Sequence, residues 1–319
     1  MIEFKRIPTI FSPDELLEMA FGRASKAPAK AGDKVKIVSK TIRDYFKKIL
    51  KRTPSLDKLP SFYFELIDAI ASIAKLKKAL AALQWASNTI SRLEREYIRK
   101  IRRAPKNEKN KYRKEFYGRV VSILEQIEDQ LEFLAGAREK LKNLPSIRDE
   151  FTIVISGAPN VGKSTFLRAI TTAKPRVESY PFTTQQILLG YFESKHEEYQ
   201  VIDTPGLLDR PIEKRNPVEK QAILALKHLA DVVLFIFDPS ERCGFQVEEQ
   251  MRIYWEMSRA FDAEVIPVIN KADLLSEEDI KNFLAALGRN AYLCSAEKKI
   301  GVGEVVKKIV EIREISESK

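Results

Sequence analysis

The chain has 319 residues, which is enough for two domains with separate hydrophobic cores. Hydrophobic residues make up 44% of it, so the composition excludes a wholly disordered protein. The net charge of +10 is uneven, because residues 1–150 carry 33 Lys and Arg against 20 Asp and Glu, whereas the other residues carry 22 against 25. This division suggests that only the first half of the chain meets a polyanion.

The composition disfavours a zinc-binding, a secreted or a membrane-spanning protein. The two cysteines, Cys243 and Cys294, and the two histidines form no recognisable zinc pattern, and so few cysteines favour a reducing, intracellular compartment. The first six residues place charges where a signal peptide needs an apolar run. No segment approaches the ~20 apolar residues of a membrane-spanning helix. We therefore expect a soluble, cytoplasmic protein without stable membrane association.

Apolar residues at helical spacing run through the first half of the chain. Pro13, followed by two acids, predicts a helix start, and a second helix is predicted over about 33–51. Two longer apolar stripes, at 66–101 and 117–141, recur at steps of three, four or seven residues, and each predicts one long amphipathic helix. Long amphipathic helices joined by a short turn pack antiparallel, so we expect an all-α N-terminal helical bundle over residues 1–148.

The periodicity changes in the second half, where short apolar runs alternate with helical segments. Such runs are typical of strands buried on both faces, and the alternation predicts a mainly parallel six-stranded sheet, covered by helices, over residues 149–319. The second and third runs are too close together for a crossover helix, so we expect them to pair antiparallel. The predicted strands are 151–156, 187–192, 199–203, 232–238, 265–270 and 291–294, and the predicted helices are 163–170, 218–229, 246–261, 277–287 and 305–315.

A phosphate-binding motif lies between the first predicted strand and the helix that follows it. Residues 157–164 fit G-x-x-x-x-G-K-[ST] in the strand–loop–helix context that the motif requires. Backbone N–H groups of such a loop surround a β-phosphate, Lys163 reaches the β- and γ-phosphates, and Ser164 ligates Mg²⁺. The predicted phosphate site comprises Gly157, Ala158, Pro159, Asn160, Val161, Gly162, Lys163, Ser164 and Thr165.

A second motif, Asp203-Thr-Pro-Gly206, ends another predicted strand. The Asp203 carboxylate can hold a Mg²⁺-bound water, and the Gly206 N–H can approach a γ-phosphate because no Cβ intervenes. An ordinary turn explains this tetrapeptide about equally well when it is taken alone.

Between the phosphate loop and Asp203, a switch segment needs a hydroxyl that joins Mg²⁺ only when the γ-phosphate is present. Thr183 and Thr184 are the candidates, and Thr184 is favoured.

The third group of residues selects the base. Asp273 follows a predicted strand, and a carboxylate there accepts hydrogen bonds from guanine N1–H and the 2-amino group, which adenine cannot provide. Ser295 and its neighbours, after the last predicted strand, would bring a backbone amide to guanine O6. All these motifs lie at the carboxyl ends of strands, where α/β sheets bind ligands. We therefore predict a guanine-nucleotide site that includes Asn270, Lys271, Asp273, Ser295, Ala296 and Glu297.

One position departs from the pattern of Ras-like enzymes. Leu207 follows Gly206 where those enzymes carry the glutamine that orients the attacking water. An apolar side chain cannot orient water, so we expect slow intrinsic hydrolysis unless a partner or an ion supplies the missing charge. Asn160 has two interpretations: it helps to coordinate a K⁺ placed like an arginine finger, or it suits a tight loop. The residues predicted to carry the reaction are Lys163, Thr184, Gly206 and Asn160.

The motifs resemble those of a known group of GTPases. The phosphate loop, Tyr180-Pro-Phe-Thr-Thr and Asp203-Thr-Pro-Gly-Leu resemble the Obg–HflX superfamily of translation-associated GTPases, and residues 203–211, 215–216, 219–229 and 240–244 resemble the Nog family of nucleolar-type GTP-binding proteins. This resemblance implies a Ras-like α/β P-loop GTPase domain preceded by a helical domain, and a role in assembly of the large ribosomal subunit. Nucleolar members continue with a long tail, so we expect a short, archaeal-like member.

Basic residues cluster around the predicted turn between the two long helices, with further groups at 26–40 and 47–52. Charges at helix ends are often merely solvated, but the excess is confined to one half and accompanies a resemblance to ribosomal factors, which favours RNA binding. Tyr112, Phe116 and Tyr117 either stack on bases or pack in the core. The predicted RNA contacts are Arg99, Lys100, Arg102, Arg103, Lys106, Lys109, Lys111, Arg113 and Lys114.

Together these features predict a GTPase that hydrolyses GTP to GDP and phosphate. We expect a monomeric nucleotide switch in large-subunit biogenesis, whose partners are GTP or GDP, Mg²⁺ and the large ribosomal subunit or its precursor. Two alternatives stay open. One is a membrane-surface GTPase whose basic helices self-associate on anionic lipid, and the other is a stress-type regulator that senses guanine nucleotides.

Overall fold

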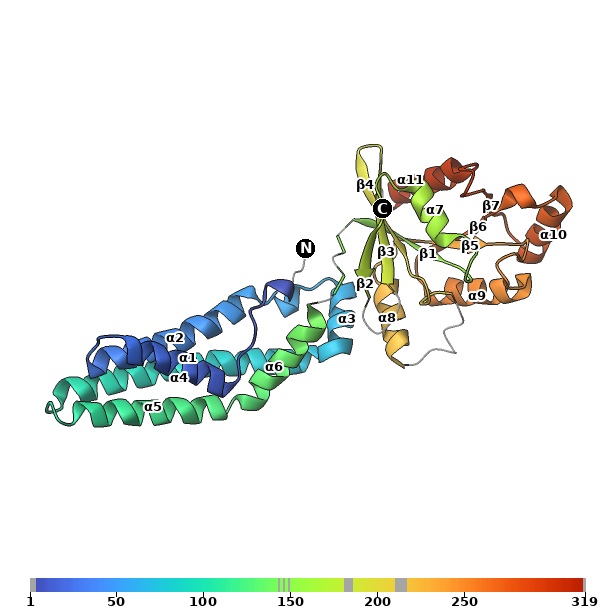
Figure 1. Ribbon diagram of the computed structural model, residues 1–319. Helices are drawn as coiled ribbons and strands as arrows, with labels where there is room; N and C mark the ends of the chain where they lie inside the picture. Colours follow the sequence, from blue (N-terminus) through green and yellow to red (C-terminus); the bar gives the residue numbers. More distant parts are fainter. Residues whose placement is uncertain are drawn as a thin grey trace. The chain divides into compact units, whose positions relative to one another are not determined.

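The computed structural model describes residues 4–142, 144–145, 147–148, 150–180, 186–209 and 217–317 (Figure 1). The chain forms two compact units. A helical unit comprises residues 2–59 and 67–144, and a sheet unit comprises residues 60–66 and 145–319 together with residue 1. Residues 60–66 therefore group with the sheet unit although they precede most of the helical sequence. The division at residue 148 that the sequence predicts stays a proposal.

The helical unit is built from amphipathic helices whose apolar faces meet in one core. Pro13 begins the first helix as predicted, and a capping box fixes that start, because Ser12 and Glu15 each accept the other's backbone N–H, at 3.2 and 2.8 Å. No helix within the described ranges is both long and apolar enough to cross a membrane. The helices of this half of the chain are α1 (Pro13–Lys26), α2 (Ala31–Arg52), α3 (Ser61–Ala71), α4 (Ile73–Arg103), α5 (Lys109–Glu125) and α6 (Glu128–Leu141), with single turns η1 (Phe4–Arg6) and η2 (Leu56–Lys58). The first residues of α3, up to Leu66, group with the sheet unit.

Each long apolar stripe forms two helices, so the prediction of one continuous helix per stripe is wrong. The first stripe breaks at Ser72, which has a φ of 48°. The Asp68 carboxylate accepts the Ile73 N–H at 2.7 Å and so begins α4 with a side-chain bond in place of a helical one. The second stripe breaks at Ile127, which has a φ of −112°, and α6 then starts with two acids that suit a helix N-terminus.

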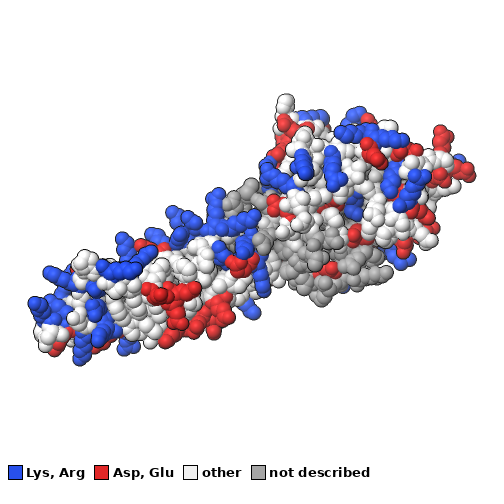
Figure 2. Space-filling model, in the orientation of Figure 1, with Lys and Arg blue, Asp and Glu red and all other residues white. Residues whose placement is uncertain are grey.

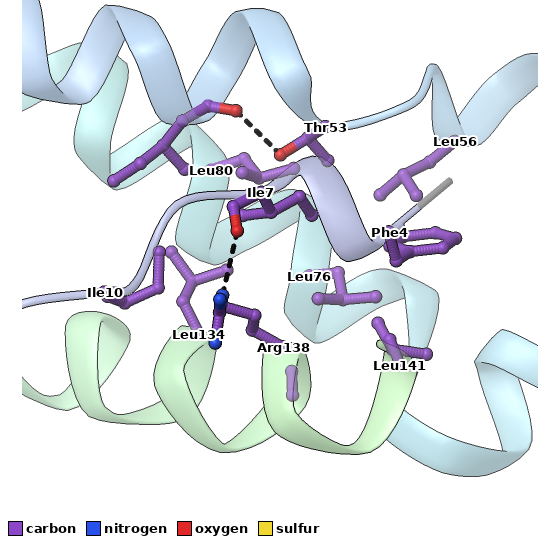
Figure 3. Close-up of a pocket in the computed structure, with 12 residues that line it drawn as sticks. Phe4, Ile7, Ile10, Thr53, Leu56, Leu76, Leu80, Leu134, Arg138 and Leu141 are labelled. Carbon is purple, nitrogen blue, oxygen red and sulfur yellow. Dashed lines mark hydrogen bonds between the residues drawn. The ribbon is translucent and has the colours of Figure 1, made fainter. Parts of the chain in front are cut away.

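The N-terminal segment packs across the bundle and closes its core (Figure 3). Phe4, Ile7 and Ile10 are buried against side chains of α2, α4 and α6, and the Arg138 guanidinium donates to the Ile7 carbonyl at 2.9 Å. The space that remains among these apolar side chains is a cavity of about 20 Å³. A cavity of that size holds at most one water, so we assign it to imperfect packing and to no ligand.

The sheet unit contains seven described strands in the order β2-β3-β4-β1-β5-β6-β7. Neighbours from β4 to β7 run parallel, whereas β3 pairs antiparallel with β2 and β4, as predicted for the second and third apolar runs. The strands are β1 (Phe151–Ser156), β2 (Arg176–Ser179), β3 (Gln186–Ser194), β4 (Glu197–Asp203), β5 (Val232–Phe237), β6 (Glu264–Ile269) and β7 (Tyr292–Leu293).

Helices cover both faces of this sheet, with α7 and α11 on one side and α9 on the other (Figure 1). Strand β5, which lies between β1 and β6, is buried along its whole length, which explains its unbroken apolar sequence. The predicted count of six strands was one too few, because β2 is a polar and mostly exposed edge strand without an apolar run. The helices are α7 (Lys163–Ile170), α8 (Pro217–Lys227), α9 (Val247–Ala260), α10 (Glu277–Leu287) and α11 (Val302–Glu317), with the single turn η4 (Ala272–Leu274).

The break between α3 and α4 can be tested by its cap. We expect Asp68→Ala to lower the free energy of unfolding by about 1 kcal/mol, because the Ile73 N–H loses its side-chain acceptor. Urea titration followed by circular dichroism measures this change. Asp44→Ala, at an exposed position within α2, is the matched control and should not destabilise the protein. Equal destabilisation in the two variants would contradict the capping role.

Candidate nucleotide-binding site

The loop between β1 and α7 follows a path that its two glycines make possible. Gly157 and Gly162 have φ values of 139° and 100°. A Cβ on Gly157 would lie 2.4 Å from the Ile236 carbonyl oxygen, and one on Gly162 would lie 2.3 Å from the Asn270 amide nitrogen. Asn160 has a φ of 60°, a left-handed conformation that asparagine tolerates. The tight-loop interpretation of Asn160 therefore has a backbone reason.

Lys163 opens α7 and turns its ammonium into this loop. The side chain is buried, and Nζ donates to the carbonyl oxygens of Gly157 at 2.9 Å and Ala158 at 2.8 Å. Burial lowers the pKa of Lys163, and the nearby Asp203 and Asp209 carboxylates oppose that fall. A buried ammonium whose hydrogen-bond acceptors, among the described residues, are neutral carbonyls strongly attracts phosphate oxygens.

Asp203 and Ser164 form the oxygen pair expected for Mg²⁺. Asp203 ends β4 and is fully buried, and its Oδ2 accepts a hydrogen bond from the Ser164 hydroxyl at 2.5 Å. Its Oδ1 is buried without a hydrogen-bond partner among the described residues. Burial raises the pKa of Asp203 above its ordinary value, against the Ser164 hydrogen bond and the Lys163 charge. A hydroxyl beside a carboxylate with one unpaired oxygen fits a small, hard cation.

The segment after β4 turns back at once toward the protein interior. Gly206 has a φ of 73°, and its N–H donates to Asp209 Oδ2 at 2.9 Å. Leu207 is only 1% exposed, so its side chain cannot contact an attacking water in this conformation. The slow hydrolysis predicted from Leu207 stays a prediction. The switch candidates Thr183 and Thr184 lie outside the described residues.

The side-chain amide of Asn270 connects the base motif to the two other loops. Its Nδ2 donates to the Val161 carbonyl oxygen at 2.9 Å, and its Oδ1 accepts the Ala296 N–H at 2.9 Å. Ser295 and Ala296 are buried, whereas Glu297 is exposed. The phosphate loop, the segment after β6 and the segment after β7 thus meet at one buried amide.

Asp273 lies beside this junction in η4 and carries a paired charge. Its carboxylate forms an ion pair with Lys298 at 2.9 Å. Hydrogen bonds from Lys298 and Ser295 hold the pKa of Asp273 below its ordinary value. The carboxylate is therefore ionised at neutral pH, as a double acceptor of hydrogen bonds must be. At the other side of the site, Thr165 is exposed in the first turn of α7.

Two buried residues support the site and were missed from the sequence. Asp238, directly after β5, is fully buried, and its Oδ2 forms an ion pair with Lys271 at 2.5 Å. Lys271 also donates to the Asn160 carbonyl oxygen at 3.2 Å. Gln250 fixes the turn, since it accepts the Asp238 N–H at 2.8 Å and donates to the Asp238 carbonyl oxygen at 2.9 Å. The available signal was Asp238 itself, a charged residue at the end of an apolar strand.

The fold and these motifs define a P-loop GTPase fold preceded by a helical domain. Two family models match the chain: the NOG1 N-terminal helical domain over residues 4–148, and Nucleolar GTP-binding protein 1 (NOG1) over residues 217–273. The chain belongs to the nucleolar GTP-binding protein 1 family, which confirms the predicted Nog resemblance.

Relatives from archaea and eukaryotes match most of the chain. An uncharacterized protein of Methanocaldococcus jannaschii is 45% identical over 87% of this chain and 83% of its own length. Nucleolar GTP-binding protein 1 of Saccharomyces cerevisiae is 34% identical over 90% of this chain and 47% of its own length. The chain thus spans about half the length of the nucleolar GTP-binding proteins that it matches.

Solved structures match a shorter stretch of the chain. A candidate nucleolar GTP-binding protein 1 of Plasmodium falciparum is 36% identical, with a TM-score of 0.47 over 55% of this chain and 92% of its own. The G domain of the Thermotoga maritima FeoB iron transporter is 26% identical, with a TM-score of 0.43 over 51% of this chain and 98% of its own.

The Asp238–Lys271 ion pair can be tested as a support of the loop that is predicted to contact the guanine base. We expect Asp238→Asn to weaken binding of a fluorescent GDP by about tenfold, because Lys271 loses the charged partner that holds it against the phosphate loop. In a Lys271→Met background the same change should have little further effect, as a double-mutant cycle measures. Asp262→Asn, which alters an exposed carboxylate, is the control. Additive losses in the cycle would contradict an action through Lys271.

Proposed function

We propose that the protein binds GTP with Mg²⁺ and hydrolyses it to GDP and phosphate. The observation that carries this proposal is the meeting of three loops at the buried Asn270 amide. These loops follow β1, β6 and β7, whose carboxyl ends share one edge of the parallel sheet. The arrangement favours a ligand that presents phosphates to the first loop and a guanine to the other two.

Each group has a defined part in this proposal. Lys163 binds the β- and γ-phosphates, and the Gly206 N–H binds the γ-phosphate. Ser164 and Asp203 hold Mg²⁺, which would neutralise charge on the transferred phosphate when bound, and Thr184 is proposed to join them. Asp273 orients the guanine through two hydrogen bonds. No described side chain takes the place of the missing glutamine, so we infer that a partner or a cation at Asn160 completes the reaction.

The second part of the proposal is that this switch acts in assembly of the large ribosomal subunit. Support comes from the family and from the charge of the helical unit. In Figure 2 basic side chains gather along the upper side and at the left end of the helical unit, whereas acidic ones lie along part of its lower side. Around the α4–α5 turn the exposed basic residues are Arg99, Lys100, Arg102, Arg103, Lys106, Lys111 and Lys114. Phe116 is buried and Tyr117 stacks on Phe21 at 4.6 Å, which favours their core-packing interpretation. A cytoplasmic location and a monomeric state stay predictions.

Co-sedimentation with large ribosomal subunits tests both parts. The protein is centrifuged through sucrose with a non-hydrolysable GTP analogue, with GDP, or without nucleotide, in KCl and again in NaCl. We expect comigration that depends on the analogue, because the γ-phosphate would order the switch segments. Comigration that ignores the nucleotide would contradict the switch. Flotation with anionic vesicles in place of comigration would favour the membrane-surface alternative.

Nucleotide variants test the site directly. We expect Lys163→Ala to abolish retention of GTP and GDP, because no other described ammonium bonds the phosphate loop carbonyls of Gly157 and Ala158. Asp273→Asn should weaken GDP binding and favour a xanthine nucleotide, whose 2-oxo group accepts the hydrogen bond that an amide donates. Equilibrium binding of fluorescent nucleotides measures both effects. Full GDP affinity in Lys163→Ala would show that the phosphate loop is misassigned.

The basic cluster predicts a salt-dependent affinity for ribosomal RNA. If it neutralises ~4–6 phosphates, log K should fall with log salt at a slope of about −3 to −5. Replacing Lys100, Arg103 and Lys106 by Glu should make that slope less steep by about 2 to 3. The matched control replaces three exposed lysines of the sheet unit, Lys195, Lys281 and Lys307, and changes the net charge equally. Equal losses from the two triple variants would contradict a localised RNA surface.

A further inference from the structure

The Asp209 carboxylate accepts a hydrogen bond from the Gly206 N–H, the backbone group proposed to bind the γ-phosphate. The Gly206 N–H donates to Asp209 Oδ2 at 2.9 Å, which is a good hydrogen-bond length. A backbone N–H has one hydrogen, so it cannot make full hydrogen bonds to this carboxylate and to a phosphate oxygen at once. The two acceptors therefore compete for one donor.

The charge of Asp209 also reaches the other proposed phosphate ligands. It is among the charges that oppose the fall in the pKa of Lys163, after the larger effect of Asp203. It adds to the rise in the pKa of Asp203 as well, although burial is the main cause. Asp209 thus lies within electrostatic range of the ammonium and the carboxylate that surround the proposed γ-phosphate position.

The residues between Gly206 and Asp209 are fixed to the protein interior. Leu207 and Leu208 are each 1% exposed. The Leu208 carbonyl oxygen accepts the Ser156 hydroxyl at 2.9 Å, and so ties the segment to the end of β1. The Leu207 N–H donates to the Thr204 carbonyl oxygen at 3.1 Å and closes the turn. With both leucines buried, the backbone of this turn is held in the conformation that brings the Asp209 side chain beside Gly206.

The same local geometry occurs at the start of α10, away from the phosphate loop. The Ser276 N–H donates to Asp279 Oδ2 at 2.9 Å, three residues ahead, as part of the α10 capping box. An acid three residues after an N–H can therefore act as a local cap alone. Asp209 differs because its donor belongs to the Asp203–Gly206 motif and its charge acts on Lys163.

We propose that Asp209 is a specificity-determining residue that occupies the γ-phosphate's place on Gly206 when the nucleotide is GDP. This inference rests on the proposed function of the site. GTP binding must displace the carboxylate, since a phosphate with about two negative charges and a carboxylate repel each other where water is excluded. Asp209 therefore favours GDP over GTP, and its departure couples the γ-phosphate to movement of the segment after β4.

The test compares dissociation constants for a fluorescent GDP and a fluorescent non-hydrolysable GTP analogue, both with Mg²⁺. The wild-type protein should bind GDP more tightly. In Asp209→Asn the ratio of the analogue's constant to that of GDP should fall by about tenfold, because a neutral amide accepts more weakly and does not repel the γ-phosphate. Asp209→Ser removes the charge with a shorter side chain and should act in the same direction. Asp279→Asn, the matched local cap, should leave the ratio unchanged.

Three results would overturn the inference. Wild-type preference for the analogue would exclude an internal competitor of the γ-phosphate. An unchanged ratio in a folded Asp209 variant, with cooperative thermal unfolding and GDP binding retained, would leave Asp209 as a turn cap only. Failure of the wild-type protein to bind either nucleotide would overturn the proposed function and, with it, this inference.

Discussion

The rest of the candidate site depends on the buried side-chain amide of Asn270. Its hydrogen bonds to the Val161 carbonyl and from the Ala296 N–H tie the phosphate loop to two segments that lie more than a hundred residues further along the chain. A buried amide is stable only when its polar atoms are paired, so the three loops must keep fixed distances from one another. Gly162 permits the arrangement, because a Cβ there would lie 2.3 Å from the amide nitrogen.

The base side and the phosphate side of the site differ in how fully their buried polar groups are paired. On the base side, Asp238, Gln250 and Lys271 all have partners within hydrogen-bond distance. On the phosphate side, Asp203 Oδ1 and Thr204 Oγ1 are buried without hydrogen-bond partners among the described residues. Unpaired buried oxygens destabilise a protein by about 1–3 kcal/mol each. We propose that a site organised in this way is preformed where it would bind the base and gains most of its missing bonds when phosphates and a cation bind.

The accuracy of the secondary structure predicted from the sequence depended on whether a motif, a cap or an apolar pattern marked each element. The helices 163–170 and 277–287 were predicted with their observed bounds, because a glycine-rich motif and a Ser cap mark where they begin. The apolar stripes could not reveal the break at Ser72, since a single residue with altered dihedrals leaves the spacing of the stripe intact. The polar edge strand β2 carries no periodic signal either.

Within the candidate site, the sequence pointed to residues with candidate chemical roles and missed the buried residues that position them. Lys163, Asp203 and Asn270 belong to contiguous motifs, and the structure brings their loops together. The contact between Asp238 and Gln250 joins residues twelve positions apart on a strand end and a helix, and only the tertiary fold brings them together. The bond from Gly206 to Asp209 is local, yet a turn of Asp, Pro and Gly predicts no particular acceptor.

Leu207 contributes to the conformation of the segment after β4 as well as lacking a polar group that could orient water. Burying a leucine side chain stabilises a conformation by roughly 1.5–3 kcal/mol, and both Leu207 and Leu208 are buried while Asp209 accepts the Gly206 N–H. Replacing a glutamine by leucine therefore does more than remove a group that orients water. It adds apolar contact energy to the conformation in which the Gly206 N–H, the donor that we propose for the γ-phosphate, is already occupied by Asp209. Whatever moves this segment into a hydrolytic conformation must supply that energy, which favours control by an external partner.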